Sequence, residues 1–224
     1  MPSFEYDKDY PFAAFITNLG KYNEGELVGE WVKFPTSAEE IWAVFDRIGI
    51  GQKDDFGYTY EEWFITDYDC YVDGLYDKLG EYENLDYLAA KLDDMTRGEY
   101  EQFQAAIEMG NHCGSLHEII NLTKNLDCYD VCPDIHDYDD LGRYYIEELD
   151  AMQVPEYLRN YIDYESYGRD VAIDENGEFT SFGYVRDTGD SFVEVYDRNR
   201  ENIPEEYRVM STAEEELTKE EKIE

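Results

Sequence analysis

Two apolar runs open the folded part of the chain: Phe12-Ala13-Ala14-Phe15-Ile16-Thr17-Asn18-Leu19 and Leu27-Val28-Gly29-Glu30-Trp31-Val32-Lys33-Phe34. Both runs are rich in β-branched and aromatic side chains, which favour strands. The segment between them, residues 20–25, begins and ends with glycine. Because glycine readily adopts the positive φ of tight turns, we predict two strands joined by a hairpin-like connection.

A helix and a further strand are predicted to follow this pair. Ser37-Ala38-Glu39-Glu40 has the spacing of a capping box, and apolar side chains recur at helical spacing until Gly49. Residues 60–66 alternate in the manner of a strand. The sequence therefore predicts a small β-sheet plus helix domain over residues 12–67, preceded by a leader, residues 1–11.

The next two segments differ in their periodicity. Residues 68–126 show helical spacing, with two more capping boxes at Thr96–Glu99 and Ser115–Glu118, and predict a helical bundle domain. Residues 127–196 predict an α+β domain in which Asp137 caps a helix and Pro155 occupies a first helical turn. Its predicted strands are residues 171–173, 179–185 and 191–196. Residues 197–224 are polar, and we expect a partly mobile tail with one helix from Thr212. The expected fold class is therefore α+β.

The charge of the chain is extreme. Its 224 residues hold 55 acids and 18 bases, a net charge of −37, while 42% are hydrophobic and 16% aromatic. That apolar content is enough for a folded core. A surface this negative repels phosphate groups, so nucleic acid and anionic membranes are excluded as partners and a basic partner is expected.

Targeting signals and cysteine usage predict a cytoplasmic protein. No run of 18 apolar residues occurs, and the first residues do not resemble a signal peptide. Four cysteines are too few for a disulfide-stapled secreted domain, so we expect reduced thiols.

Neither a metal site nor a catalytic site is predicted, and no cofactor is expected. Two groups of side chains superficially offer zinc ligands, but their spacing does not fit a zinc site: His112, Cys113 and His117; Cys128, Cys132 and His136. The opening of a calcium loop at residues 69–74 lacks the carboxylates at its third and twelfth positions. Phosphate-binding and nucleophile motifs are absent as well.

The number of excess acids is comparable to the charge of a DNA segment. Duplex DNA carries one negative charge per roughly 1.7 Å of axis, so 37 charges correspond to roughly 63 Å of duplex. Residues 61–168, which are predicted to be folded, carry 21 of the 37. Because a DNA-binding protein contacts phosphates without reading sequence, carboxylates at similar spacing on a rigid scaffold could occupy its site.

Two parts of the sequence resemble the ArdA family of antirestriction proteins. The first is Ile16-Thr17-Asn18-Leu19-Gly20-Lys21-Tyr22-Asn23-Glu24-Gly25-Glu26-Leu27-Val28-Gly29-Glu30-Trp31. The second is Gly142-Arg143-Tyr144-Tyr145-Ile146-Glu147-Glu148, followed by residues 154–170. The resemblance spans about Phe12 to Tyr196 and is weakest between Asp67 and Asp134, where only acidity and helical character match.

The resemblance implies a non-catalytic DNA mimic carried on mobile elements. Such a protein would form an elongated, curved homodimer of three-domain subunits and would occupy the DNA-binding groove of Type I restriction-modification enzymes. Its third domain would form the dimer interface through Val154, Tyr157, Leu158 and Tyr161. A core role for the same four side chains stays open.

The phosphate-mimicking acids are expected among exposed acids of the middle region. Single neutral substitutions among them should be nearly silent, and blocks of five or more should reduce inhibition. The predicted acids are Asp73, Asp77, Glu81, Glu83, Asp86, Asp93, Asp94, Glu99, Glu101, Asp137, Asp139, Asp140, Glu147 and Glu148.

Other functions stay open at this point. The target could be another defence nuclease, such as a CRISPR effector. An acidic chaperone of basic proteins would share the composition without a duplex-like arrangement of charges. A halophilic enzyme would use its acids for solubility in brine, but it would need the catalytic groups that the sequence lacks.

Overall fold

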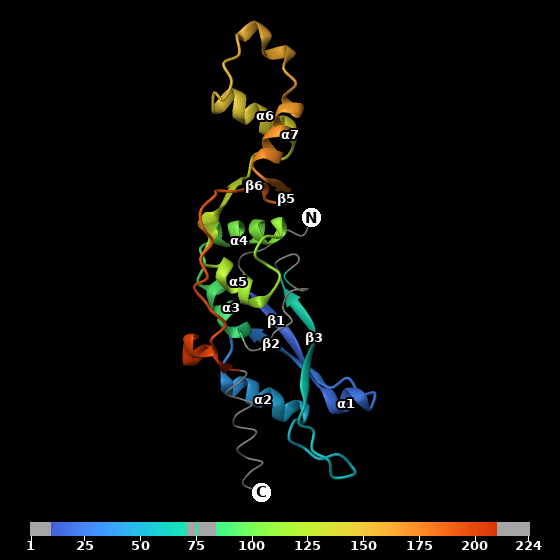
Figure 1. The fold of residues 1–224 in the computed structure, drawn as a ribbon. Coiled ribbons are helices and arrows are strands. Elements are labelled where there is room, and N and C mark those ends of the chain that lie inside the picture. The colour runs from blue at the N-terminus through green and yellow to red at the C-terminus, as the bar shows by residue number, and fades with distance from the viewer. Residues whose placement is uncertain (1–9, 71–74, 76–83, 210–224) are drawn as a thin grey trace. The chain divides into compact units, whose positions relative to one another are not determined.

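The structure is a computed structural model that describes residues 10–70, 75 and 84–209 (Figure 1). The described residues form an α+β fold with two three-stranded antiparallel sheets, which confirms the predicted class. The chain divides into two compact units. Unit 1 comprises residues 1–95, 115–120 and 196–224, and unit 2 comprises residues 96–114 and 121–195. No helix in the described part of the chain is long and apolar enough to cross a lipid bilayer.

The sheet of unit 1 contains the two strands predicted first. β1 (Phe12–Asn18) lies between β2 (Gly29–Phe34) and β3 (Trp63–Cys70), and Phe12 pairs with Phe34 on one side and Cys70 on the other. Phe12 and Ile16 of this central strand are fully buried. β3 begins three residues later than predicted and continues to Cys70.

The connection between β1 and β2 is helical, not a simple turn. α1 (Leu19–Asn23) begins where the Asn18 side chain accepts a hydrogen bond from the Lys21 backbone N–H at 3.0 Å. This cap stabilises a helical turn that apolar patterning alone did not indicate. Gly25 has a φ of +91°, the positive value expected of a glycine at the end of this connection.

The helix predicted after Ser37 is confirmed. α2 (Ala38–Ile48) starts at Ser37, whose hydroxyl accepts from the Glu40 backbone N–H, and ends at Gly49 in the left-handed conformation. Its predicted apolar face is buried: Ile41, Val44, Phe45 and Ile48.

The helical character predicted for residues 68–126 is confirmed from Leu85 onward, whereas residues 68–70 belong to β3 and residues 71–74 and 76–83 lie outside the described residues. α3 (Leu85–Asp93) belongs to unit 1, α4 (Arg97–Met109) belongs to unit 2, and α5 (Leu116–Leu122) begins in unit 1 and ends in unit 2. The capping box at the start of α4 is complete, because Thr96 and Glu99 bond reciprocally.

The beginning of the polar tail is packed, and the partly mobile tail over residues 197–224 stays a prediction. It contains two short 3₁₀ helices, η6 (Arg200–Asn202) and η7 (Glu205–Tyr207). Ile203 and Val209 are buried, and the Tyr207 ring lies 5.8 Å from the Tyr87 ring of α3. A few apolar side chains thus suffice to attach residues 197–209 to unit 1. The helix predicted from Thr212 falls outside the described residues.

The sheet of unit 2 differs from the prediction. A 3₁₀ turn, η3 (Leu126–Cys128), leads into β4 (Tyr129–Cys132), which was not predicted. The single strand predicted over residues 179–185 is a hairpin of β5 (Glu178–Thr180) and β6 (Gly183–Asp187), and the order is β4-β6-β5. Gly183, with a φ of +109°, permits the reversal.

The strand predicted at residues 171–173 is wrong, because these residues belong to a helix. α6 (Tyr138–Arg143) continues into a π-helical turn, η4 (Tyr144–Glu148), then a 3₁₀ helix, η5 (Glu156–Tyr161), and α7 (Tyr164–Asp174). Gly142 and Gly168 bring α6 and α7 together: a Cβ on either would lie 2.0 Å from a backbone oxygen of the other helix. This packing overrides the β preference of Val171 and Ile173.

The strand predicted at residues 191–196 is wrong as well. The segment pairs with none of the described strands. Its backbone instead forms hydrogen bonds with side-chain amides of α5 and of the turn that follows α5. Asn125 accepts from the Val193 backbone N–H at 2.8 Å and donates to the Val193 carbonyl at 2.9 Å, while Asn121 accepts from the Val195 N–H. We call residues 188–195 the strap of unit 2.

Candidate functional site

An acidic cleft lies in unit 2, between the segment that starts at β4 and the helix formed by α6 and η4. It encloses about 530 Å³. Five acids line it against one base, Arg143, so the walls carry a net negative charge: Asp130, Asp134, Asp140, Glu147 and Glu148. We call these residues the acidic cleft.

Arg143 holds part of this surface in a fixed geometry. Its guanidinium lies 2.6 Å from Asp139 and 3.8 Å from Glu147, one helical turn away on either side. It also lies 4.3 Å from the centre of the Tyr164 ring, and the Tyr164 hydroxyl donates to Glu147 at 2.5 Å. The hydrogen bond to Asp139 raises the pKa of Arg143, and the hydrogen bond to Glu147 raises the pKa of Tyr164.

Backbone hydrogen bonds position the acids at the start of α6. Asp137 caps the helix by accepting from the Asp140 N–H at 2.9 Å, as predicted. Asp140 in turn accepts from the His136 N–H at 3.1 Å. Carboxylates held in this way keep their positions and need little reordering when a partner binds.

The average density of these acids is close to that of DNA phosphates, although they form two groups, residues 137–140 and 147–148. Residues 137–148 contain five acids: Asp137, Asp139, Asp140, Glu147 and Glu148. At 1.5 Å per residue this segment is about 16 Å long, or about 3 Å per acid. One strand of B-DNA carries a charge every 3.4 Å or so.

Four more of the predicted acids are surface groups in the structure. Asp93 and Asp94 are exposed at the end of α3. Glu99 is exposed at the start of α4, where the hydrogen bonds from Thr96 lower its pKa, and Glu101 pairs with Arg97 at 2.8 Å. These four acids are exposed or half-exposed, as a mimic of phosphate requires.

Asp86 is not a surface group, which corrects the prediction for this residue. Its side chain is 1% exposed, and its carboxylate accepts from the Thr36 backbone N–H at 2.5 Å. Burial raises its pKa to about 6. Asp86 therefore cannot offer a charge to a partner. The remaining four predicted acids, Asp73, Asp77, Glu81 and Glu83, lie outside the described residues.

Sequence reasoning missed two acids of the cleft, Asp130 and Asp134. Asp130 lies on β4 and pairs with Arg186 of β6 at 2.7 Å, and Asp134 follows the same strand. Because β4 itself was not predicted, nothing placed these two acids opposite α6. Alternation of Tyr129 and Val131 with Asp130 and Cys132 was the available signal.

The residues predicted for a dimer interface lie on an exposed apolar surface of unit 2. Tyr157 is 76% exposed, Tyr161 is 84% exposed and Leu158 is also exposed, whereas Val154 is half-buried. A core role is therefore wrong for the two tyrosines. Three further exposed apolar side chains, which were not predicted, belong to the same region of the chain: Leu149, Met152 and Ile173.

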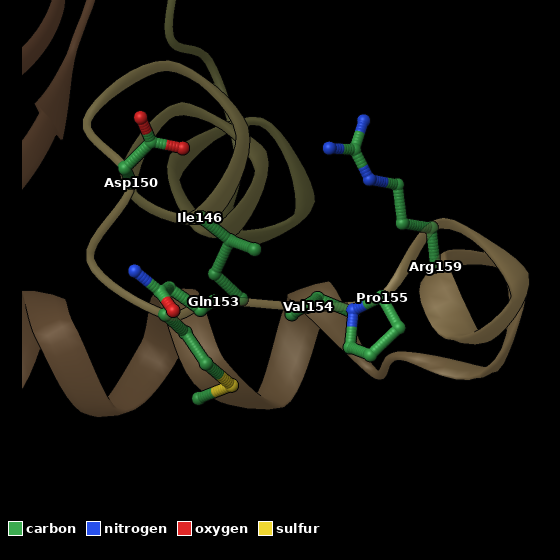
Figure 2. Close-up of a pocket in the computed structure, with 7 residues that line it drawn as sticks. Ile146, Asp150, Gln153, Val154, Pro155 and Arg159 are labelled. Carbon is green, nitrogen blue, oxygen red and sulfur yellow. The ribbon is translucent and has the colours of Figure 1, made fainter.

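A pocket of about 370 Å³ adjoins these residues (Figure 2). Ile146 forms its floor with Val154 and Pro155, and Asp150 and Arg159 stand on opposite sides of Ile146. An apolar floor between one acid and one base suits a side chain with an apolar body and a polar end.

The histidines and cysteines have structural surroundings. His112 stacks on Phe192 with ring centres 3.8 Å apart, and the Nε2 of buried His117 lies 2.7 Å from the Tyr196 carbonyl oxygen. All four cysteines are free thiols, and burial raises the pKa of Cys128 and Cys132. Within the described ranges no three metal-ligating side chains gather in one place.

A comparison with protein-family models identifies the chain. The model described as Antirestriction protein (ArdA) matches residues 14–186. The chain belongs to the ArdA family. ArdA proteins are DNA mimics that inhibit Type I restriction enzymes, and they act without catalysis. A search of curated proteins gave no match.

The ArdA match includes both the acidic cleft and the exposed apolar residues. It begins within β1 and ends within β6, so it takes in α1, α6 and α7. Residues 187–209 of this ArdA protein lie beyond the matched range, although Tyr196, Ile203 and Val209 are buried.

Proposed function

We propose that this antirestriction protein acts in the cytoplasm as a homodimer that occupies the DNA-binding groove of a Type I restriction-modification enzyme. The carboxylates of residues 137–148 and of the acidic cleft serve as phosphate mimics. The observation that carries this proposal is the average density of acids from Asp137 through α6 and η4, roughly 3 Å per acid, which is close to that of one DNA strand.

The physical basis is that a DNA groove grips phosphates mainly through Lys and Arg, without reading sequence. Carboxylates at the same spacing satisfy those cations and release the same counterions. The fixed hydrogen bonds of Asp137, Asp140 and Glu147 lower the entropy lost on binding. Exposed Asp93, Asp94 and Glu99 and half-exposed Glu101 contribute further negative charge in this proposal.

Dimerisation is proposed through the exposed apolar surface of unit 2. Large apolar side chains that are exposed together mark sites of association in soluble proteins. Tyr157, Leu158 and Tyr161 meet this description, and Val154 lines the pocket beside them. The division of each subunit into domains at residues 12–67, 68–126 and 127–196 stays a prediction.

The first test neutralises a block of acids. The variant Asp134→Asn, Asp139→Asn, Asp140→Asn, Glu147→Gln and Glu148→Gln leaves the cap at Asp137 intact. A control with the same change in charge neutralises exposed acids elsewhere: Asp190, Glu194, Glu201, Glu205 and Glu206. We expect the test block to weaken binding to a Type I methyltransferase core by about tenfold or more relative to the control, with a shallower dependence of binding on salt.

Both variants are compared in a competition assay with duplex DNA at several salt concentrations, after circular dichroism has shown that each retains its fold. Equal weakening by the two blocks would show that only total charge matters, which contradicts placed phosphate mimicry. Single substitutions within the block should be nearly silent.

The second test concerns the dimer. Tyr157→Ser with Tyr161→Ser removes two large apolar side chains from the proposed interface, so light scattering should show a monomer where the unmodified protein is a dimer. Phe56→Ser with Tyr58→Ser removes the same number of exposed aromatic rings from unit 1 and should leave the dimer intact. An unmodified protein that is monomeric at micromolar concentration, or a double tyrosine variant that stays dimeric, would refute this interface.

A further inference from the structure

A hydrogen-bonded hairpin connects α2 to β3 in unit 1. It is the cyan loop that precedes β3 in Figure 1. The Gly51 N–H donates to the Tyr60 carbonyl at 2.8 Å, the Tyr60 N–H donates to the Gln52 carbonyl at 2.9 Å, and the Asp54 N–H donates to the Tyr58 carbonyl at 2.8 Å. We call residues 51–60 the hairpin of unit 1.

The tip of this hairpin is organised by one carboxylate. The Asp54 Oδ1 atom accepts two backbone N–H groups, those of Phe56 and Tyr58, each at 2.8 Å. Gly57 supplies a φ of +88° between them. An aspartate that bonds successive N–H groups in this way fixes a turn, so the tip has a defined conformation.

The base of the hairpin is attached to α1. The Tyr60 ring packs against Gly20 so closely that a Cβ there would lie 2.3 Å from a ring carbon. The Tyr60 hydroxyl donates to Glu24 at 2.8 Å, and the Lys21 ammonium lies 5.5 Å from the centre of the ring. The hydrogen bond to Glu24 raises the pKa of Tyr60 to about 12, so this attachment persists at neutral pH.

This ordered tip exposes two aromatic rings. Phe56 is 86% exposed and Tyr58 is 75% exposed. Here the two hydrogen bonds to the Asp54 carboxylate, the bond from the Asp54 N–H to the Tyr58 carbonyl and the positive φ of Gly57 fix the backbone that carries the exposed rings. Exposed large apolar groups in a fixed conformation have the properties of binding anchors.

The electrostatic surroundings of the hairpin indicate the chemistry of a partner. Residues 51–62 contain four acids, Asp54, Asp55, Glu61 and Glu62, against one base, Lys53. The pKa of Tyr60 is raised by the negative charges of Glu24, Asp54 and Glu26. Asp54 and Asp55 directly precede Phe56 in the chain. An aromatic ring beside carboxylates attracts cations, and a guanidinium can stack on its face while it pairs with an acid.

We propose that Phe56 and Tyr58 form an aromatic anchor that contacts arginine side chains on the DNA-binding surface of the inhibited enzyme. This inference rests on the proposed function. The anchor adds a contact that carboxylates alone do not make. In this proposal the two aromatic faces take the place of DNA bases, while the acids take the place of the DNA phosphates. The acids supply a spread, salt-sensitive attraction, and the anchor fixes the position of unit 1 on the enzyme.

The test uses the full chain with Phe56→Ala and Tyr58→Ala together. Two controls accompany it: Leu27→Ala, which removes another exposed apolar side chain of unit 1, and Phe56→Tyr with Tyr58→Phe, which keeps both rings. Binding to an immobilised Type I methyltransferase core is measured over a range of salt concentrations. We expect the double alanine variant to raise Kd about tenfold at every salt concentration with an unchanged salt slope, because no charge is lost.

Both controls should bind as the unmodified protein does. An unchanged Kd for the double alanine variant, while the unmodified protein binds the enzyme, would overturn the anchor and leave the proposed function standing. A change of oligomeric state in that variant would assign the rings to self-association and overturn the anchor as well. An unmodified protein that does not bind the enzyme would overturn both.

Discussion

The Asp86 carboxylate differs from most acids of this protein in its burial. Most of the described acids are exposed and contribute to the negative field, whereas Asp86 is buried on α3 and bonded to the backbone at Thr36. Its second oxygen is buried and has no hydrogen-bond partner among residues 10–70, 75 and 84–209. A buried charge with one bond is costly, and its cost depends on pH.

The expected pH dependence follows from the direction of the shift. The pKa of Asp86 is about 6 in the folded chain and lower when unfolded, so the folded state binds this proton more tightly. Stability from this group is therefore present at acidic pH and is lost as pH rises from about 4 to about 6, by on the order of 3 kcal/mol. Asp86→Asn removes this loss.

Urea unfolding at pH 4.5 and pH 7.5 should show the variant gaining stability relative to the unmodified protein as pH rises. A difference between the two proteins that stays constant with pH would contradict this account.

Sequence reasoning could not distinguish Asp86 from its neighbours. Asp86, Asp93 and Asp94 are all acids on or beside one helix, and only the contact with Thr36, fifty residues earlier, marks the first as buried. The same limit applied to Tyr157 and Tyr161, since an aromatic spacing suits a core as well as an interface. The residue type at each position was known from the sequence. Whether its side chain is exposed depends on packing against residues that are distant in the sequence, so exposure could not be predicted.

At the level of elements, local signals predicted what depends on local hydrogen bonds. The caps at Ser37, Thr96 and Asp137 lie where the helices begin, because a cap needs only residues within one turn. Strands depend on distant partners, so β4 was missed and the hairpin of β5 and β6 was predicted as one strand. Residues 191–196, which include most of the strap, were predicted as a strand because their sequence is β-prone, although Val193 and Val195 bond to the Asn125 and Asn121 side chains.

The contact of α6 with α7 gives a prediction about packing. Gly168→Ala places a methyl group 2.0 Å from the Tyr138 carbonyl oxygen, so the helices must separate. We expect a loss of about 2–3 kcal/mol in the free energy of unfolding. Gly98→Ala, in α4 with open space around it, is the matched control and should gain up to about 1 kcal/mol. Urea denaturation measures the free energy of unfolding of both variants. If Gly168→Ala were as stable as the control, the close packing of α6 against α7 would not contribute to stability.

For the whole molecule, the net charge of −37 predicts two opposite responses to salt. Raising ionic strength from 0.01 to 0.15 M shortens the screening length from about 30 Å to about 8 Å. Self-repulsion in the folded chain then weakens, so the unfolding temperature should rise, while affinity for a basic groove should fall over the same range. Calorimetry and a binding titration in the same buffers measure the two effects. Responses with the same sign would show that one of them does not arise from the acids.

The order in which the chain builds unit 1 has a consequence for its synthesis. The unit is interrupted twice and is completed by Tyr196 and Tyr207, whose rings lie against Tyr87, more than a hundred residues earlier in the chain. A ribosome therefore delivers the first half of this unit long before its closing residues. The nascent chain must hold α3 with an uncovered face until translation is nearly finished, and a stop codon before residue 196 would release an unfinished unit for proteases to find.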